Sequence, residues 1–351
     1  MKHSQNFRKI VLCIFLALFF IAGCAKKEKI SSQAKLRLAF YGDIRNKPFG
    51  EALIEAFQKE HPSVQIKPIF IVSGYAQKLL TMIAGGDTPD LMIVGPLMMV
   101  DFVSKGILLN LQPYIDKDKE FQCFKDDIHP GSLEGSKYKG IYYSVPFWTN
   151  SLVLFYNKDL FDKEGLKYPD ESWDWDKLLS EGKRLTKDIN DDGKIDQYGF
   201  FGSFSLSDTS GGLYQYIRRN GGRLFNEDMT KCLIDSPESI EAIRWCFDLI
   251  NKYKITPSPF AGDERLRDYE QAFLSGRVVM TISGRWSIPW FNKAKFNWSC
   301  APQPKGKVEF KPSGVTLLGV YSKTKYPEEC WEFLKFMMGK ESQEIVCNLK
   351  A

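Results

Sequence analysis

Histidine is scarce in this sequence. The 351 residues include 3 histidines, and one of them, His3, lies in a segment that we expect to be removed. The sequence therefore offers few histidines for a Ser–His–Asp triad or a histidine-rich metal centre. No internal repeat or low-complexity segment stands out, which argues against a repeat-array architecture.

Cysteine spacings typical of metal sites are also missing. Downstream of Cys24, the remaining cysteines are widely separated and match no zinc-binding template. They are Cys123, Cys232, Cys246, Cys300, Cys330 and Cys347. A chain of this length does not need disulfides to complete its core, so we expect mostly free, buried thiols.

The sequence has no excess of charge that would indicate nucleic-acid binding. Removal of Lys2, Arg8 and Lys9 with the expected leader leaves 45 basic and 43 acidic residues. This near-balance predicts no basic surface for DNA or RNA.

The longest apolar run, Ile10–Ala22, is too short to span a bilayer. It follows basic residues and ends in "IAGC" at Ile21–Cys24, which resembles the lipobox of bacterial lipoproteins. We expect residues 1–23 to be a signal peptide and Cys24 to carry the lipid. Residues 24–34 then form a polar tether on the extracytoplasmic face of the cell membrane, which is the outer surface in a Gram-positive cell or the periplasmic side in a Gram-negative one.

Strand and helix patterns alternate along the first part of the chain. Strands are predicted at 35–41, 64–72 and 90–94, and helices at 49–61, 75–84 and 97–106. This order predicts an α/β fold with a parallel sheet. Ligands of such sheets bind beyond the carboxyl ends of the strands. That rule places Tyr41, Gly42 and Asp43, residues 73–75, and Gly95–Pro96 on one rim.

A second lobe is predicted after the segment 140–161. This segment has a strand that ends at Val145, then Pro146, and a new strand at 152–156. Helices at 173–187 and 238–252 and a returning strand at 277–286 follow. We expect the first lobe to comprise 35–145 with about 284–316. The second lobe is expected to comprise 146–283 with about 317–351, with hinges near Val145–Pro146 and Ser283–Trp286.

Six segments in this order resemble one family. They are "YAQKLLTMIAGGDTPDLMIV", "YKGIYYSVPFWTNSLVLFYNKDLFDKEGL", "SWDWDKLLSEGKRLTK", "DDGKIDQYGF", "FLSGRVVMTISGRW" and "YPEECWEFLKFMMGKESQE". The chain is similar to the extracellular solute-binding proteins of family 1, the maltose-binding-protein-like receptors of ABC sugar importers. Members usually continue for several dozen residues beyond the segment equivalent to "ESQEIV". We therefore expect a member shortened at its C-terminus, whose second lobe lacks the part that normally packs on it.

The resemblance implies a two-lobe, type II periplasmic-binding-protein fold with a hinge and an interlobe cleft. It implies a receptor rather than an enzyme: a monomer that captures a mono- or oligosaccharide by closing its lobes and delivers it to the permease. A sugar phosphate or another small polar solute is the alternative ligand, for which Arg45, Lys47 and Arg285 offer positive charge.

Aromatic and planar polar residues are the expected carbohydrate contacts, because sugars present flat C–H patches edged with hydroxyls. The resemblance places Trp286 under the ligand. The alternative for each aromatic is a core position, which we favour for Trp173, Trp175 and Trp290. The candidate ligand residues are Tyr41, Asp43, Tyr75, Trp148, Thr149, Asn150, Phe204 and Trp286.

A calcium loop is the second candidate site. Asp188, Asn190, Asp192 and Asp196 occupy positions 1, 3, 5 and 9 of an EF-hand-like pattern, with Gly193 at position 6. Position 12, which normally holds a bidentate carboxylate, is Gly199. The alternative is a polar turn held by side-chain hydrogen bonds. A structural calcium ion is thus the one cofactor that the sequence suggests, and none is required.

The stretch "TMIAGGDTPDLMIV" at Thr81–Val94 raises the question of catalysis. Its glycines lack the Lys and Ser/Thr of a phosphate loop and precede a strand instead of opening a helix. Asp87 and Asp90, or Asp43 and Asp90, form a carboxylate pair on paper, but many such pairs exist in a chain with 43 acidic residues. We therefore interpret the stretch as a helix end, with Gly85 as its cap, followed by a strand. A secreted glycoside hydrolase is the least favoured function.

Overall fold

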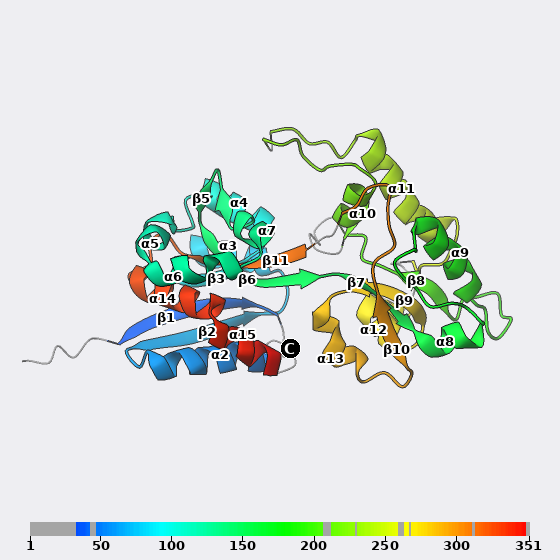
Figure 1. Ribbon diagram of the computed structural model, residues 1–351, viewed down its shortest axis with the longest axis horizontal. Helices are drawn as coiled ribbons and strands as arrows, with labels where there is room; N and C mark the ends of the chain where they lie inside the picture. The colour runs from blue at the N-terminus through cyan, green and yellow to red at the C-terminus, as the bar shows by residue number, and fades with distance from the viewer. Residues whose placement is uncertain are drawn as a thin grey trace, which may run out of the picture.

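The computed structural model describes residues 33–42, 47–205, 212–228, 230–258, 263–266, 268–310 and 313–348. The signal peptide, Cys24, Asp43 and Arg45 lie outside these residues. Two lobes lie side by side, each built around its own sheet, and the chain passes between them along two neighbouring segments (Figure 1).

Within the described residues, five strands form the sheet of the first lobe in the order β2-β1-β3-β11-β6. β1 is parallel to β2 and β3, whereas β11 is antiparallel to both of its neighbours. β6 therefore runs in the direction of β3. The strands are β1 (Ala34–Tyr41), β2 (Val64–Ile71), β3 (Leu91–Val94), β6 (Ser144–Ser151) and β11 (Ser313–Val320). The strands predicted at 35–41, 64–72 and 90–94 are confirmed to within a residue at each end.

Helices cover this sheet with the apolar faces that the sequence predicts. Phe49, Leu53 and Phe57 recur every four residues in α2 (Lys47–Glu60), and all three are buried. The predicted helix at 75–84 is α3 (Tyr75–Ala84), with Gly85 at its C-cap. The other helices of this region are α4 (Pro96–Ser104), α5 (Gln112–Lys117), α6 (Lys119–Phe124), α7 (Pro130–Glu134), α14 (Pro327–Met338) and α15 (Lys340–Asn348). Short elements complete it: η1 (Lys125–Asp127), β4 (Lys137–Tyr138) and β5 (Ile141–Tyr142).

The second sheet has the order β10-β7-β9-β8. β7 is antiparallel to β9 and β10, and β8 is parallel to β9. Its strands are β7 (Val153–Asn157), β8 (Tyr198–Phe201), β9 (Val278–Ser283) and β10 (Trp298–Ala301). Helices around it are α8 (Lys158–Lys163), α9 (Trp175–Leu185), α10 (Leu213–Arg219), α11 (Pro237–Asn251), α12 (Tyr269–Leu274) and α13 (Ile288–Phe291), with the turns η2 (Glu264–Leu266) and η3 (Arg285–Ser287). The helices predicted at 173–187 and 238–252 are therefore confirmed in α9 and α11.

The first crossing between the lobes lies later than predicted. β6 continues through Pro146, because β6 is the edge strand of its sheet and proline is tolerated there. Phe147 is the extra residue of a bulge, since Pro146 and Trp148 pair with the consecutive residues Leu317 and Thr316. The chain passes into the second lobe between Ser151 and Val153, so the hinge predicted at Val145–Pro146 is misplaced.

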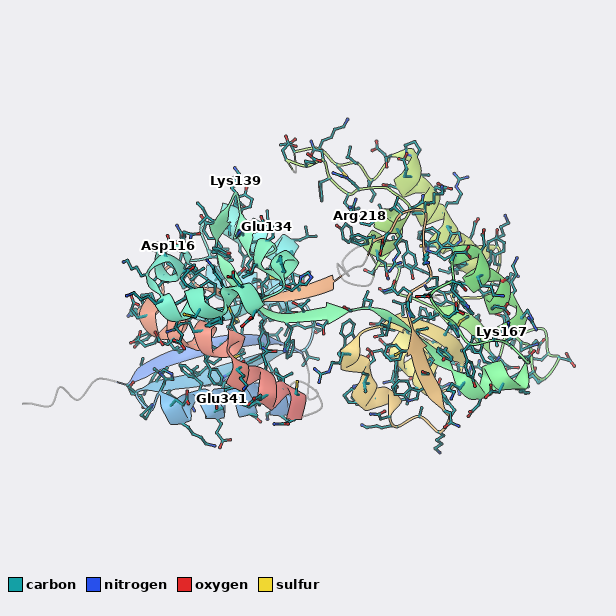
Figure 2. The ribbon with its side chains drawn as sticks, in the orientation of Figure 1. Asp116, Glu134, Lys139, Lys167, Arg218 and Glu341 are labelled. Carbon is teal, nitrogen blue, oxygen red and sulfur yellow. The ribbon has the colours of Figure 1, made fainter. Side chains whose placement is uncertain are left out.

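The second crossing runs from β10 to β11 instead of lying at Ser283–Trp286. Its first part stays on the second lobe: Arg219 Nη1 donates to the carbonyl of Pro304 at 3.1 Å, and the Val308 N–H donates to the carbonyl of Arg219 at 2.9 Å. The Arg218 guanidinium lies 5.2 Å from the ring centre of Phe310. In Figure 2, Arg218 lies on the side of the second lobe nearest the first.

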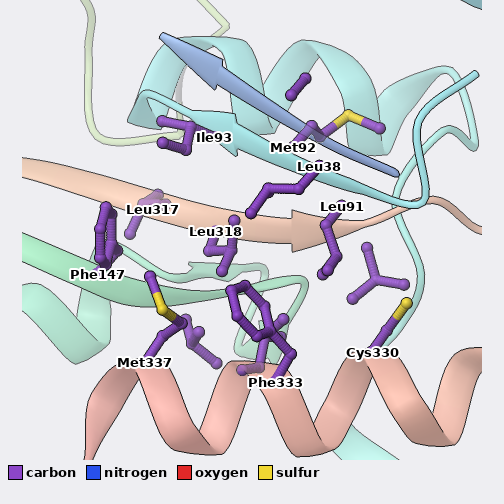
Figure 3. Packing of buried hydrophobic residues seen from close by; sticks show 14 of the residues in the cluster. Leu38, Leu91, Met92, Ile93, Phe147, Leu317, Leu318, Cys330, Phe333 and Met337 are labelled. Atoms are coloured by element: carbon purple, nitrogen blue, oxygen red, sulfur yellow. The ribbon is translucent and has the colours of Figure 1, made fainter. Parts of the chain in front are cut away.

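The C-terminal part of the chain belongs to different lobes than expected. Residues 298–301 pair with β7 in the second sheet, whereas β11 lies inside the first sheet. α14 then packs on that sheet: Cys330, Phe333 and Met337 point toward its strands (Figure 3). The boundary near 316 is thus corrected, because β11 completes the first sheet between β3 and β6, a pairing that local sequence patterns do not reveal.

The cysteines of the described residues are free, as expected. The expectation that most are buried is wrong. Cys246 and Cys330 are buried, whereas Cys123, Cys232, Cys300 and Cys347 are exposed. Burial raises the pKa of the Cys246 thiol well above its ordinary value, which makes this thiol unreactive.

Candidate ligand site

The carboxyl edge of the first sheet presents an exposed tyrosine. Tyr41 is the last residue of β1, pairs in register with Ile71 of β2, and is 61% exposed. Val72, which follows β2, is 68% exposed. Because parallel strands end at the same edge, Tyr41 and Val72 form an apolar rim where ligands of α/β sheets bind.

Tyr75 supports this rim instead of joining it. Its ring meets the Tyr41 ring edge-on at 5.5 Å, and it is only 6% exposed. Its hydroxyl donates to the carbonyl of Ala39 at 3.0 Å. Burial raises the pKa of this hydroxyl. The hydrogen-bonding end of Tyr75 therefore faces β1 and not the solvent.

Trp148, Thr149 and Asn150 lie on an extension beyond the carboxyl edge of the first sheet. Val94 at the end of β3 pairs with Leu317, whereas Asn150 pairs with Gly314, nearer the start of β11. The paired ends of β6 and β11 therefore project past β3, toward the second lobe (Figure 1). This extension brings the three predicted residues to the crossing.

The surroundings of Trp148, Thr149 and Asn150 differ. The Trp148 ring stacks on Phe147 at 4.2 Å and contacts Phe49 at 4.6 Å, so much of it belongs to the core. Its indole Nε1 is buried and has no hydrogen-bond partner among the residues that the structure describes. Thr149 is exposed, and its hydroxyl lies 2.6 Å from that of Ser132 in α7. Thr149 therefore reaches the surface more fully than Trp148 does, whereas Asn150 and Trp148 are both half-buried.

The second sheet presents aromatic residues just beyond the carboxyl ends of its two parallel strands. β8 and β9 are parallel, and Phe204 and Trp286 each follow the end of one of these strands by three residues. Trp286 is 37% exposed. Phe204 is half-buried against Tyr216 of α10, with ring centres 5.4 Å apart. Ser283, at the end of β9, pairs with Val153 at the start of β7, so this edge adjoins the first crossing.

The predicted ligand residues thus fall into three groups. Tyr41 and Tyr75 are in contact, Trp148–Asn150 lie on the β6–β11 extension, and Phe204 and Trp286 lie at the edge of the second sheet. Asp43 falls outside the described residues. Sequence reasoning missed the exposed Val72 and the contact between Thr149 and Ser132, since isolated apolar and serine residues carry no signal of their own.

The stretch at 85–90 is scaffold, as the sequence interpretation holds. Gly86 takes φ +73° at the helix end. The Asp87 carboxylate pairs with the Arg37 guanidinium, which holds the pKa of that carboxyl below its usual range. Asp90 accepts the backbone N–H of Arg37 at 2.9 Å and the Thr324 hydroxyl at 2.6 Å. Both carboxylates therefore fasten strands together instead of facing a substrate.

The loop at 188–196 is held by its own side chains. Asp188 accepts the backbone N–H groups of Asp192 and Gly193 at 3.2 and 2.7 Å, and Asn190 also accepts that of Asp192. Asp196 accepts the Ile189 N–H, which is the main reason that its pKa lies below the usual range, and it also pairs with Arg277. In the described part of the chain, no three acidic, histidine or cysteine side chains are grouped to hold a metal ion. These bonds match the polar-turn alternative.

This architecture, with two α/β lobes joined at adjoining crossings, agrees with the comparison to known proteins. The chain matches the family model of the bacterial extracellular solute-binding proteins over residues 43–344, and it belongs to this family. These proteins are receptors of ABC transporters rather than enzymes, and they work on the extracytoplasmic side of the membrane.

Individual relatives share about a quarter of their residues with this chain. The arabinooligosaccharide-binding protein of Bacillus subtilis is 24% identical over 95% of this chain and 76% of its own length. The maltodextrin-binding protein MdxE of the same species is 26% identical over 93% and 75%. An ABC substrate-binding protein of Listeria monocytogenes, solved in complex with cycloalternan, superposes with a TM-score of 0.81, at 27% identity over 91% of this chain and 79% of that one.

Among the helices that the structure describes, none is long and apolar enough to cross a membrane.

Proposed function

We propose that this chain captures a carbohydrate between its two lobes and delivers it to an ABC permease. One observation carries the proposal: each lobe presents an exposed aromatic ring at a strand end on the side of the crossing, Tyr41 at 61% and Trp286 at 37% exposure. Aromatic faces are the groups that stack on the C–H patches of sugars. Relatives whose names record arabinooligosaccharide and maltodextrin binding support this ligand class.

Closure of the lobes is the proposed mechanism. Ser151 pairs with Ser313, so the two crossing segments lie side by side and permit rotation about one line. A sugar that contacts both lobes binds the closed state more tightly than the open state, which shifts the population toward closure. The permease then recognises the closed form of the monomer.

A titration tests the ligand class. Purified protein lacking residues 1–23 is titrated by calorimetry with a panel of mono- and oligosaccharides, and small-angle scattering follows closure. We expect micromolar binding of at least one sugar with a smaller radius of gyration. Substitution of Tyr41 or Trp286 by alanine should weaken binding about tenfold or more, the effect of losing one good aromatic contact. The proposal fails if no sugar in the panel binds the folded protein.

A phosphorylated solute is the competing ligand. Arg285 is exposed next to Trp286, and Lys47 lies at the start of α2. The same titration with glycerol phosphate and sugar phosphates separates the two ligand classes. If binding requires the phosphate and is lost in Arg285→Ala, the ligand is an anionic solute and not a neutral sugar.

We also propose that Cys24 carries a lipid that anchors the receptor. Labelling with a radioactive fatty acid should mark the wild type, and Cys24→Ala should abolish the label and release the protein from the membrane fraction. Equal label in both proteins would exclude Cys24 as the anchor.

A further inference from the structure

A tight turn presents Trp286 at the edge of the second sheet. β9 ends at Ser283, Gly284 follows, and η3 leads directly into α13. A Cβ atom built on Gly284 would lie 2.1 to 2.5 Å from atoms of the Trp286 ring, so the indole folds back over the glycine backbone. The ring position therefore depends on the path of these few residues.

A buried network of hydrogen bonds joins the two ends of this turn to α12. The Ser283 and Ser287 hydroxyl oxygens lie 2.5 Å apart, and Ser287 donates to the carboxylate Oε1 of Glu270 in α12. Because the Ser287 hydroxyl donates its proton to Glu270, the Ser283 hydroxyl donates to Ser287 Oγ, and it also lies 3.5 Å from the same Glu270 Oε1. Both serines are 0% exposed and Glu270 is 8% exposed.

This hydrogen-bond network touches both ends of the segment that carries Trp286. Its two serines bracket Gly284–Trp286, so it fixes both ends of the segment that carries the indole. Its acceptor is a carboxylate held away from solvent, which is costly unless its hydrogen bonds are satisfied. Apolar side chains of similar size would fill the same space without this cost. Hydroxyls that bond a carboxylate add directional geometry, which apolar packing does not provide.

We propose that Glu270, acting through Ser287 and Ser283, is the positioning residue that sets the orientation of Trp286 toward the ligand. This inference rests on the proposed function, in which Trp286 contacts the sugar. Ser283 also pairs with Val153, the first residue after the crossing, so the same network joins the indole to the strand that enters the second lobe.

Two kinds of measurement test this role. The first needs no ligand: the protein is labelled with 5-fluorotryptophan, and Trp286→Phe identifies the ¹⁹F resonance of position 286. We expect Glu270→Ala and Ser287→Ala to shift or broaden this resonance and to leave those of the first lobe unchanged. Glu270→Gln keeps the Oε1 acceptor and should restore the resonance in large part.

The second measurement is affinity for whichever sugar binds the wild type. Glu270→Ala should weaken binding about tenfold, the effect of one lost aromatic contact. In a Trp286→Ala background the same substitution should have no further effect, because the positioned group is gone. Glu181→Ala is the matched control: Glu181 is also buried in the second lobe, at 6% exposure, but pairs with Lys177 and Arg184 in α9.

The outcomes separate the two proposals. If no sugar binds the wild type, the proposed function fails while the ¹⁹F measurement still decides the role of Glu270. If Glu270→Ala lowers stability but leaves the Trp286 resonance and the affinity unchanged, Glu270 is merely structural and the inference is wrong. Independent losses of affinity for Glu270→Ala and Trp286→Ala would also overturn it. Should Glu270→Ala fail to fold, Ser287→Ala provides the disrupting variant, and Glu270→Gln, which keeps the acceptor, is its conservative counterpart.

Discussion

The Tyr75 hydroxyl ties α3 to β1, and its burial makes its contribution depend on pH. The pKa of the folded hydroxyl is raised, whereas an unfolded tyrosine titrates near pH 10. Above about pH 10 the unfolded chain releases this proton and the folded chain keeps it, so the unfolded state binds fewer protons. The free energy of unfolding therefore falls as the pH rises through this range, and at lower pH this group makes it neither rise nor fall with pH.

Tyr75→Phe tests this reasoning. At neutral pH we expect a loss of about 1 kcal/mol, because the hydrogen bond to the Ala39 carbonyl disappears. Above about pH 10, the wild type should lose up to about 1.4 kcal/mol per pH unit more than the variant. Urea unfolding between neutral pH and pH 11 measures both, with the half-buried Tyr253→Phe of the second lobe as control. Parallel pH profiles for wild type and Tyr75→Phe would contradict the prediction.

At the scale of elements, α9 and β8 approach so closely that only glycine fits. A Cβ atom on Gly199 would lie 2.1 Å from the carbonyl oxygen of Gly182. We expect Gly199→Ala to destabilise the second lobe by about 3 kcal/mol, since helix and strand must separate. Gly95→Ala is the control, because nothing lies within 4 Å of its Cβ position and its φ of −89° suits alanine. Equal unfolding midpoints for the two variants would show that the contact relaxes without cost.

The loop at 188–196 gives a second prediction at this scale. Because Asp188 already accepts two backbone N–H groups, we expect the loop to be stable without calcium. Asp188→Ala should lower the free energy of unfolding by about 1 kcal/mol, the usual effect of losing a capping carboxylate. This loss should be the same in the presence of calcium and in the presence of a chelator. Calorimetric melting in both conditions, with magnesium as control, measures this. A calcium-dependent rise of the wild-type midpoint that Asp192→Ala removes would instead establish a calcium loop.

Elements with strong local patterns could be predicted from the sequence, and long-range pairings could not. Tyr75–Ala84 and Leu91–Val94 carry a clear period or a continuous apolar run. Pro146 misled the prediction because its effect depends on whether the strand lies at an edge. The place of β11 between β3 and β6 follows from sheet closure, which no local pattern encodes.

The candidate site, too, could be predicted only in part from the sequence. The rule that ligands bind at carboxyl strand ends selected Tyr41, and the family resemblance selected Trp286; both side chains are exposed. It did not distinguish Tyr75, whose hydroxyl turns inward to β1, because burial depends on the whole lobe. The bond between Ser287 and Glu270 joins common residue types 17 positions apart, and nothing in their spacing predicts it.

At the scale of the whole molecule, the end of the described chain stabilises the first lobe. Cys330, Trp331, Phe333, Leu334 and Met337 of α14 are buried in the core of that lobe. The Phe333 ring meets the Phe57 ring of α2 edge-on at 5.0 Å. Each lobe therefore has its own core, and the first is complete only when α14 docks.

Phe333→Ala distinguishes this arrangement from one in which residues 317–351 belong to the second lobe. The side chain is 0% exposed, so we expect a loss of about 3–5 kcal/mol confined to the first lobe. Hydrogen exchange should speed up at buried amides of β1 and β3 and stay unchanged in β7 and β9, because local opening follows the stability of each cooperative unit. Phe200→Ala, at a site equally buried in the second lobe, is the control and should give the reverse pattern. Faster exchange in the second sheet of Phe333→Ala would mean that the two cores unfold together, and the lobes would then act as one cooperative unit.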